Sequence, residues 1–405
     1  MPTLVRDRLT WLTFAQLAVY GYFLYGFGPS VPLLRDELGV SNAVSGLHGT
    51  ALAAGALLSG AAYAPLAARW GRARTLRRGL VGMVAGVGVY CFGPVLPVTM
   101  TGVLVCGFSG SLVVTGTTVV LSTRHGPAGP AAISEANAGA AGAGLVAPLL
   151  VGAGLSAGLG WRPGILITAV AAGVVWVLSV RYARRPARSD DAAVTRAGEN
   201  RLDEGGGDAP GRLPARYWLA WTVLVLCIGV EFCLTFWAAD SLREHAGASP
   251  ATATAGVTAV VAGMCAGRLV GGRVALRVDP GRLLLTALAL SAAGFAVFWL
   301  ATAAPLALAG LAVCGLGIAL HFPLGVARAV AASGRRPDRG AGRISFAAGL
   351  ASGVAPFVLG ALADRSGTHT AFLLVPVLLV AAAGCVLASL HEAQSDRDLP
   401  AAAQV

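Results

Sequence analysis

The amino-acid sequence predicts an all-α membrane protein, with twelve transmembrane helices arranged as two parallel repeats of six. Three observations predict this fold class. The chain of 405 residues is 56% hydrophobic and only 12% charged, whereas soluble domains carry about 25% charged residues. Apolar runs long enough to cross a bilayer recur along the chain, and its first half aligns with its second half at one constant shift.

Composition also excludes several classes of function. The net charge of +11 comes entirely from arginine, without lysine. The arginines cluster in short stretches between apolar runs, which is typical of membrane loops rather than of a nucleic-acid surface. The seven cysteines lie apart without metal-ligand spacing, so no metal and no cofactor are expected. No nucleotide-binding or catalytic signature is present, so we do not expect an enzyme.

The first half contains six apolar runs of the length that spans a bilayer. The earliest follows charged residues without a prompt cleavage pattern, so it is predicted to be a transmembrane helix rather than a removed signal. The six runs occupy residues 11–33, 43–67, 79–96, 98–121, 134–158 and 163–182. Residues 1–182 therefore form an N-terminal six-helix bundle.

A charged, glycine-rich segment over residues 183–216 separates the halves and is predicted to be a cytoplasmic linker. Residues 217–391 form the C-terminal six-helix bundle, and residues 392–405 a cytoplasmic tail. The second set of apolar runs occupies residues 217–239, 250–275, 282–301, 304–330, 342–362 and 369–390.

The distribution of arginine predicts the orientation. If both termini are cytoplasmic, the outer loops contain only Arg35, Arg162, Arg243 and Arg365, and nearly all other arginines lie inside. Basic residues concentrate on the cytoplasmic side of membrane proteins. We therefore expect a multi-pass protein of the cell (plasma) membrane, embedded in the lipid bilayer as a monomer.

The repeat is visible in several matching stretches. "VAPLLVGA" (146–153) matches "VAPFVLGA" (354–361), and "LRDELGVS" (34–41) matches "LREHAGAS" (242–249), each at a shift of 208 residues. The shift holds across five helices without a gap. This constancy indicates two repeats of the same orientation.

The loop between the second and third predicted helices lies in "LAARWGRARTLRRG" (66–79). With this stretch between two six-helix halves, the chain resembles the major facilitator superfamily, whose loop reads G-x-L-a-D-r-x-G-r. The matching residues are Leu66, Ala67, Arg69, Gly71 and Arg72. Ala68 stands where the family has an aspartate that latches the two halves together.

The resemblance implies a 12-helix secondary transporter, similar to drug-efflux members. It implies alternating access and a substrate cavity between the halves, lined mainly by the first, fourth, seventh and tenth helices. Parallel repeats place binding sites near the midplane on physical grounds as well. In the family's drug–proton antiporters the fourth helix carries an arginine, which "VLVCGFSGSLVVTG" (103–116) lacks.

Glu231 lies near the middle of the seventh predicted helix, in "GVEFCL". A charge at bilayer depth costs about 2.5–3.5 kcal/mol on insertion scales, so such a residue faces a cavity or a partner. Glu231 is accordingly a candidate for carrying a coupling proton. The alternative is a structural carboxyl that is hydrogen-bonded to a neighbouring helix.

His321 in the tenth predicted helix is the second proton-coupling candidate, because imidazole titrates near neutral pH. It could pair with Glu231 across the cavity. The alternative is a neutral histidine bonded to backbone that Pro323 frees, since proline breaks a helix.

Further polar and aromatic residues on the cavity helices are candidates for substrate contacts. Tyr22 and Tyr25 are three residues apart and share a helix face. Packing between helices, or an aromatic belt at the membrane interface, is the alternative for these side chains. The candidates are Gln16, Tyr22, Tyr25, Ser109, Thr115 and Trp237.

Glu135 and Arg343 begin the fifth and eleventh helices at equivalent places in the repeat, since 135 plus 208 is 343. Their opposite charges could form an inner gate. The alternative is that both are simply helix-end residues at the interface.

These observations favour a secondary active transporter that moves a small organic compound by alternating access, with proton-coupled efflux as the leading interpretation. Uptake or uniport of a small metabolite is the alternative within transporters. A membrane receptor of the same fold that no longer transports is the alternative from another class.

Overall fold

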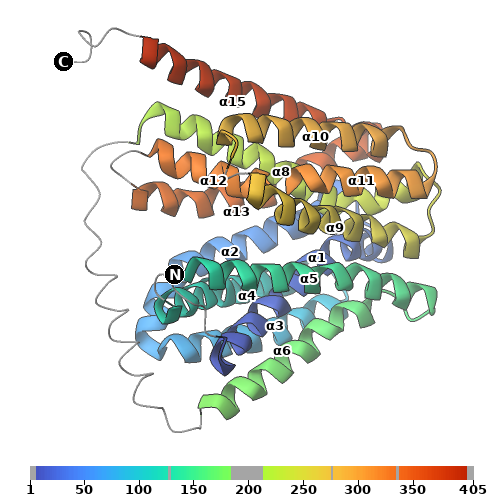
Figure 1. Ribbon diagram of the computed structural model, residues 1–405. Helices are drawn as coiled ribbons and strands as arrows, with labels where there is room; N and C mark the ends of the chain where they lie inside the picture. The colour runs from blue at the N-terminus through green and yellow to red at the C-terminus, as the bar shows by residue number, and fades with distance from the viewer. Residues whose placement is uncertain (1–5, 126–128, 184–212, 275–276, 334–336, 399–405) are drawn as a thin grey trace. The chain divides into compact units, whose positions relative to one another are not determined.

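The computed structural model describes residues 6–125, 129–183, 213–274, 277–333 and 337–398, and within these ranges every regular element is helical (Figure 1). The first half contains six helices. They are α1 (Arg8–Leu38), α2 (Asn42–Trp70), α3 (Arg72–Phe92), α4 (Leu96–His125), α5 (Gly129–Ser156) and α6 (Arg162–Ala183). The fold class predicted from the sequence is confirmed.

The second half repeats this order with two interruptions. Its helices are α8 (Ala215–Glu244), α9 (Pro250–Val274), α10 (Pro280–Leu300), α11 (Ala304–Ile318), α12 (His321–Ala332), α13 (Pro337–Ser366), α14 (Thr368–Ala371) and α15 (Leu374–Asp398). Two apolar runs expected to be continuous helices are interrupted. The run expected over residues 304–330 forms α11 and α12, and the run expected over residues 369–390 forms α14 and α15. The last helix also continues into the segment expected to be a tail.

The chain divides into two compact units. The first contains Met1–Gly207 with Ser249–Thr258, and the second contains Asp208–Ala248 with Ala259–Val405. Most of the expected linker lies outside the described residues. The domain boundaries proposed from the sequence therefore stay a prediction.

Eleven segments among the described residues are long and apolar enough to span a membrane. The helix outside this set is α3, which begins earlier than the expected residue 79. Its first two turns contain Arg72, Arg74, Arg77 and Arg78, which lower its mean hydropathy.

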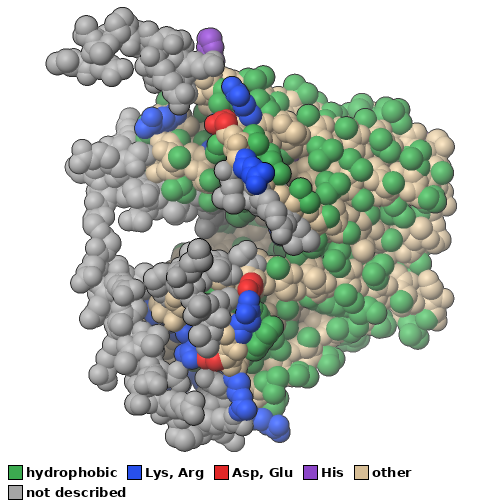
Figure 2. Space-filling view, viewed as in Figure 1, with side chains coloured by type: hydrophobic (Ala, Val, Ile, Leu, Met, Phe, Trp, Pro, Cys, Tyr) green, Lys and Arg blue, Asp and Glu red, His purple; other side chains and the backbone are tan. Residues whose placement is uncertain are grey.

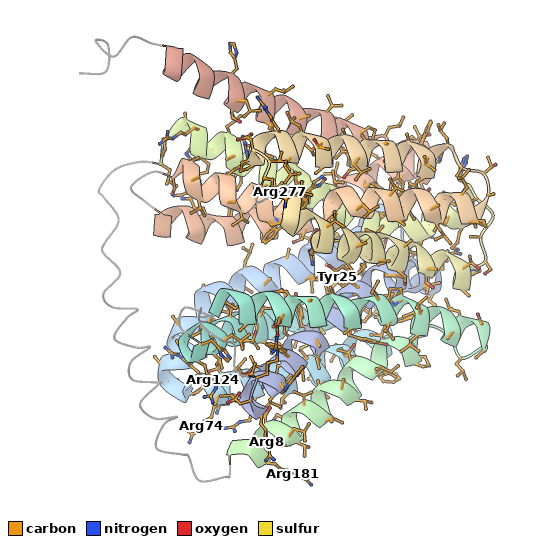
Figure 3. All side chains as sticks on the ribbon, in the orientation of Figure 1. Arg8, Tyr25, Arg74, Arg124, Arg181 and Arg277 are labelled. Atoms are coloured by element: carbon orange, nitrogen blue, oxygen red, sulfur yellow. The ribbon has the colours of Figure 1, made fainter. Side chains whose placement is uncertain are left out.

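Charge is segregated along the helices of each unit. On the face shown in Figure 2, arginine and carboxylate side chains gather at one end of each unit, and hydrophobic side chains cover the remainder. In Figure 3, Arg8, Arg74, Arg124 and Arg181 all lie toward the end of the first unit where α1 begins. This grouping agrees with the arginine pattern used to predict orientation.

Helix ends follow local sequence rules. Asp7 caps α1 by accepting a hydrogen bond from the Thr10 amide at 2.9 Å, and Asp279 caps α10 in the same way with Pro280 at the first helical position. Gly39 ends α1 in the left-handed region with φ 63°, and Gly247 adopts φ 60° just after α8. The two glycines are 208 residues apart.

Close contacts between helices repeat at the same shift. Gly55 of α2 lies so close to the Leu104 carbonyl of α4 that a Cβ would overlap its oxygen, and Gly263 of α9 lies the same way against Ala312 of α11. Three further glycine pairs obey the shift, namely Gly86 and Gly294, Gly102 and Gly310, and Gly107 and Gly315. The halves are therefore structural repeats as well as sequence repeats.

Candidate functional site

Glu231 lies near the middle of the 30-residue helix α8. It is half-buried, and its carbonyl oxygen accepts a 2.9 Å hydrogen bond from Thr235 Oγ1. The other carboxylates in the described spans lie within two turns of a helix end. Glu231 is thus the described acidic side chain most deeply placed along a spanning helix.

His321 begins α12, directly after the interruption at Ala319 and Leu320. Its side chain is 2% exposed. Its Nε2 lies 3.2 Å from Ser291 Oγ of α10, and its buried Nδ1 has no hydrogen-bond partner. The ring therefore packs toward α10 rather than toward α8, which favours the packing interpretation. Coupling through a Glu231–His321 pair stays a prediction.

The helix break lies upstream of the position expected from the sequence. The interruption precedes His321, and Pro323 lies in the first turn of α12. In a continuous helix the Pro323 ring would clash with the carbonyl of Ala319, four residues earlier, so the proline is consistent with a break at Ala319 and Leu320. Gly317 lies against Ser291 and the Ala287 carbonyl of α10, so tight packing on α10 accompanies the break.

Two candidates on α1 contact α6 within the first unit. The Tyr22 hydroxyl donates to the Gly164 carbonyl at 2.8 Å. The Gln16 side chain is 5% exposed and donates from Nε2 to Ser179 Oγ at 3.2 Å. Both groups make helix–helix hydrogen bonds, so the structure favours a packing role for them.

Of the remaining substrate candidates, Ser109, Tyr25 and Trp237 pack against neighbouring helices, and Thr115 is partly exposed. Ser109 is buried against Gly82 of α3, and the ring of Tyr25 lies against Gly144 of α5 (Figure 3). Thr115 is half-buried on α4. Trp237 is 1% exposed and donates to the Pro356 carbonyl of α13 at 2.9 Å, which favours packing between helices, one of the alternatives left open by the sequence.

The loop motif forms a tight junction between α2 and α3. Gly71 joins the helices with φ 81°, a conformation that favours glycine, and its amide donates to the Ala67 carbonyl at 2.8 Å. Thr75 Oγ1 donates to the Leu66 and Gly71 carbonyls at 3.4 and 3.1 Å. This turn at Gly71 places Arg69 in the last turn of α2 and Arg72 at the start of α3.

The two gate candidates have described partners within their own units. Glu135 forms an ion pair with Arg6 at 2.6 Å. The Arg343 guanidinium lies 5.1 Å from the Trp218 ring centre, and its carbonyl accepts from Trp221 Nε1 at 2.9 Å. A gate formed by Glu135 and Arg343 stays a prediction.

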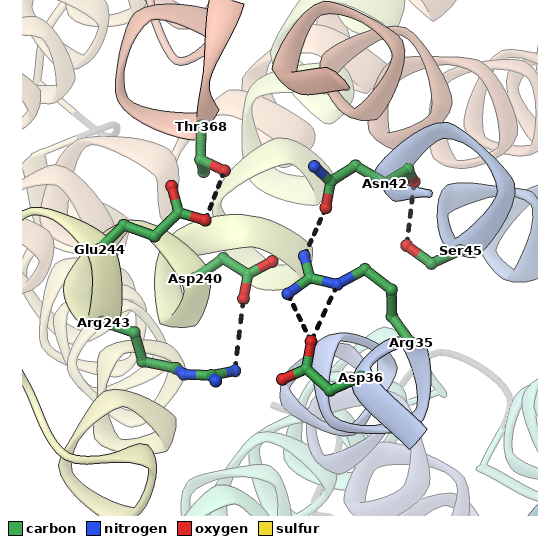
Figure 4. Close-up of polar contacts among 8 residues, drawn as sticks. All are labelled: Arg35, Asp36, Asn42, Ser45, Asp240, Arg243, Glu244 and Thr368. Carbon is green, nitrogen blue, oxygen red and sulfur yellow. Dashed lines mark hydrogen bonds and ion pairs between the residues drawn. The ribbon is translucent and has the colours of Figure 1, made fainter. Parts of the chain in front are cut away.

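Sequence reasoning missed Asp240, which is 1% exposed in α8. Its Oδ1 lies 3.7 Å from Nη1 of Arg243 (Figure 4). The signal was available, because opposite charges three residues apart in a helix are neighbours. The sequence also missed a buried pair in the first unit, in which His48 Nε2 lies 3.0 Å from Thr99 Oγ1. No spacing rule connects residues so far apart in the chain.

Comparison with known proteins identifies the class. A profile of the Major Facilitator Superfamily matches residues 13–239 and 217–404, and the chain belongs to this family. It is therefore a multi-pass membrane transporter of small molecules rather than an enzyme. No curated protein sequence matches the chain.

Solved structures share the fold at low identity. A bacterial homologue of the human lysosomal transporter Spinster, in an inward-facing occupied conformation, has a TM-score of 0.76 and 15% identity, covering 98% of this chain and 100% of the other. A D-xylose–proton symporter gives 0.69 and 15%, covering 94% and 96%. The human organic anion transporter MFSD10 gives 0.64 and 16%, covering 95% and 100%. At these identities the likeness shows the fold alone.

Proposed function

We propose that the chain is a proton-coupled secondary transporter that exports a small organic compound across the cell membrane, with both termini in the cytoplasm and the monomer as the working unit. The observation that carries this proposal is Glu231, a carboxyl at mid-length in a membrane-spanning helix. Since the charged form is costly at this depth, Glu231 binds and releases a proton as its surroundings change between states. The partners are the substrate, the proton and the lipid bilayer.

Proton-coupled uptake is the second candidate function. A D-xylose–proton symporter has the same fold, which supports import as a use of this architecture. Import and export need the same carboxyl and differ in the direction of substrate movement relative to the proton. Transport direction therefore decides between the two functions.

The proposal is tested with purified protein in liposomes. Substrates are first found by comparing the growth of cells with and without the protein against a broad panel of toxic compounds. Uptake of a radiolabelled hit is then measured with an imposed pH gradient, and separately as exchange without a gradient. Export predicts that substrate moves against the proton flow, whereas import predicts movement with it.

Glu231→Gln is the decisive variant. The amide keeps the size of the side chain but cannot release a proton, so gradient-driven transport should fall at least tenfold while exchange persists. Asp364→Asn, at an exposed position in the last turn of α13, is the matched control and should transport like the wild type. A normal gradient-driven rate in Glu231→Gln would end the proton assignment.

A further inference from the structure

Two histidines stack at the end of the second unit where α8 terminates. The rings of His245 and His369 have centroids 3.8 Å apart and an interplanar angle of 17°. The Trp299 ring covers the other side of His369 at 4.5 Å and 11°. Trp299 Nε1 also donates to the His369 carbonyl at 3.0 Å. Three helices therefore meet in one aromatic stack, because His245 follows α8, His369 belongs to α14 and Trp299 lies in the last turn of α10.

The corresponding junction in the first unit is built from an ion pair. At the end of α1, the Glu37 carboxylate accepts from Arg162 Nη1 and Nη2 at 2.9 and 2.6 Å. It also accepts from Trp161 Nε1 at 2.9 Å. Arg162 Nε donates to the Cys91 carbonyl at the end of α3. The same three helices of the repeat are thus joined in both units, by an ion pair in the first and by stacked rings in the second.

The difference in chemistry predicts a difference in pH response. A carboxylate–guanidinium pair keeps both charges from about pH 5 upward, whereas imidazole changes charge between about pH 5 and 8. Neutral imidazoles stack favourably, but two imidazolium ions face to face repel each other. The buried Nδ1 of His369 has no hydrogen-bond partner, so a proton added there gains no compensating bond.

Other charged side chains around the stack are few. From α8 they are Asp240, Arg243 and Glu244, and from the end of α13 they are Asp364 and Arg365. Glu244 already accepts a 3.2 Å hydrogen bond from Thr368 Oγ1, and Asp240 faces Arg243 (Figure 4). Neither α10 nor α11 has a charged residue near the turn that joins them. Mild acid therefore adds positive charge to a stack whose neighbouring carboxylates, Glu244 and Asp240, already have partners.

We propose that the His245–His369–Trp299 stack is an acid-sensitive latch, which fastens the end of α8 to α14 and α10 at neutral pH and loosens in mild acid. The latch goes beyond the proposed function, because it regulates the mobility of α8 and carries no coupling proton. With cytoplasmic termini, this end faces the exterior, so the latch responds to external acid.

The test is a double-mutant cycle of thermal stability in the full-length protein in detergent. His245→Ala, His369→Ala and the double variant are melted at pH 7.5 and at pH 5.0. At pH 7.5 we expect each single variant to lower the melting temperature by about 2–4 °C, with a favourable coupling between the two positions. At pH 5.0 the coupling should vanish or change sign, which a purely structural contact would not do.

Two further variants make the result decisive. His245→Phe keeps a stacking ring without a titrating nitrogen, so it should melt higher than the wild type at pH 5.0 and serves if an alanine variant does not fold. His391→Ala, exposed on α15, is the control and should shift the melting temperature equally at both pH values. Equal coupling at pH 7.5 and 5.0, or wild-type pH dependence in His245→Phe, would overturn the latch. Because Glu231→Gln should keep the pH-dependent coupling, failure of the proton assignment would leave this result unaffected.

Discussion

Several polar side chains within the spanning helices have hydrogen-bond partners on adjacent helices of the same unit, and many hydroxyls bond to a carbonyl of their own helix. Tyr22 and Gln16 bond to α6, Trp237 bonds to α13 and His321 bonds to α10. Lipid offers no hydrogen bonds, so a polar group in the bilayer must find a partner inside the protein. A polar residue in a transmembrane sequence is consequently a weak indicator of substrate contact unless packing leaves it accessible.

Tyr22 tests this distinction. Removing its hydroxyl leaves the buried Gly164 carbonyl without that donor, so Tyr22→Phe should lower the free energy of unfolding by about 1 kcal/mol and leave KM for the substrate unchanged. Trp176→Phe is the control, since Trp176 is an exposed aromatic side chain on α6. A raised KM with normal thermal stability would assign Tyr22 to the substrate instead.

Asp7 provides a pH-dependent contact at the start of α1. Burial raises the pKa of this carboxyl, but hydrogen bonds from Thr10 and the adjacent Arg124 outweigh burial and hold the pKa below its usual value of 3.8. A lowered pKa in the folded state means that stabilisation is present above about pH 4 and is lost as pH falls through the folded pKa. Asp7→Asn retains a helix cap but loses the charge. It should cost about 0.5 kcal/mol at pH 7, and thermal melts should show that difference shrinking below pH 4. A difference that stays constant down to pH 3 would contradict this account.

At the scale of the elements, local signals located the helices better than they located their interruptions. Apart from α3, apolar runs of suitable length mark the described spans, because a bilayer of fixed thickness demands them. The break between α11 and α12 lies at the residue with which Pro323 would clash in a continuous helix, and it coincides with packing of Gly317 against Ser291 of α10. The sequence identified Pro323 as the helix breaker but placed the break after His321 rather than before it.

Close helix packing predicts strong glycine dependence at repeated positions. In α2, a Cβ at Gly55 would overlap the Leu104 carbonyl and the Phe108 amide of α4, whereas a Cβ at Gly60 meets nothing within 4 Å. Gly55→Ala should therefore destabilise the protein by about 1–3 kcal/mol. Gly60→Ala is the matched control in the same helix and should be neutral or stabilise by about 0.4–1 kcal/mol. Melting temperatures that fall equally in both variants would show that helix packing is not the cause.

At the scale of the whole molecule, the repeat is the organising feature. The shift of 208 residues found in the sequence reappears in glycine contacts and in the left-handed glycines after α1 and α8. The repeat also shows where the halves diverge. The junction of α1 with α6 uses Glu37 and Arg162, whereas the junction of α8 with α14 uses stacked histidines.

The orientation of the whole chain is a separate prediction. A reporter inserted within residues 190–210 should read cytoplasmic, and one fused after Gly367 should read external, because the arginine-rich ends of the helices face the cytoplasm. Paired fusions to a phosphatase and to a fluorescent protein at each position provide the measurement. Opposite readings at either position would reverse the assignment of the two sides, including the exterior position of the histidine latch.

The sequence by itself determined the fold class, the spans and the repeat. These three features depend on composition and periodicity, which can be read from each segment's own residues. The bilayer requires a similar apolar length of every helix that spans it. It also singled out Glu231, since a carboxylate surrounded by apolar residues needs no tertiary information to be noticed. Only the tertiary structure decided which polar side chains pack against neighbours, as for Tyr22 and His321, and which distant residues meet, as for His245 and His369. Such contacts join helices far apart in the chain, and helix periodicity states which face a residue occupies but not which helix that face meets.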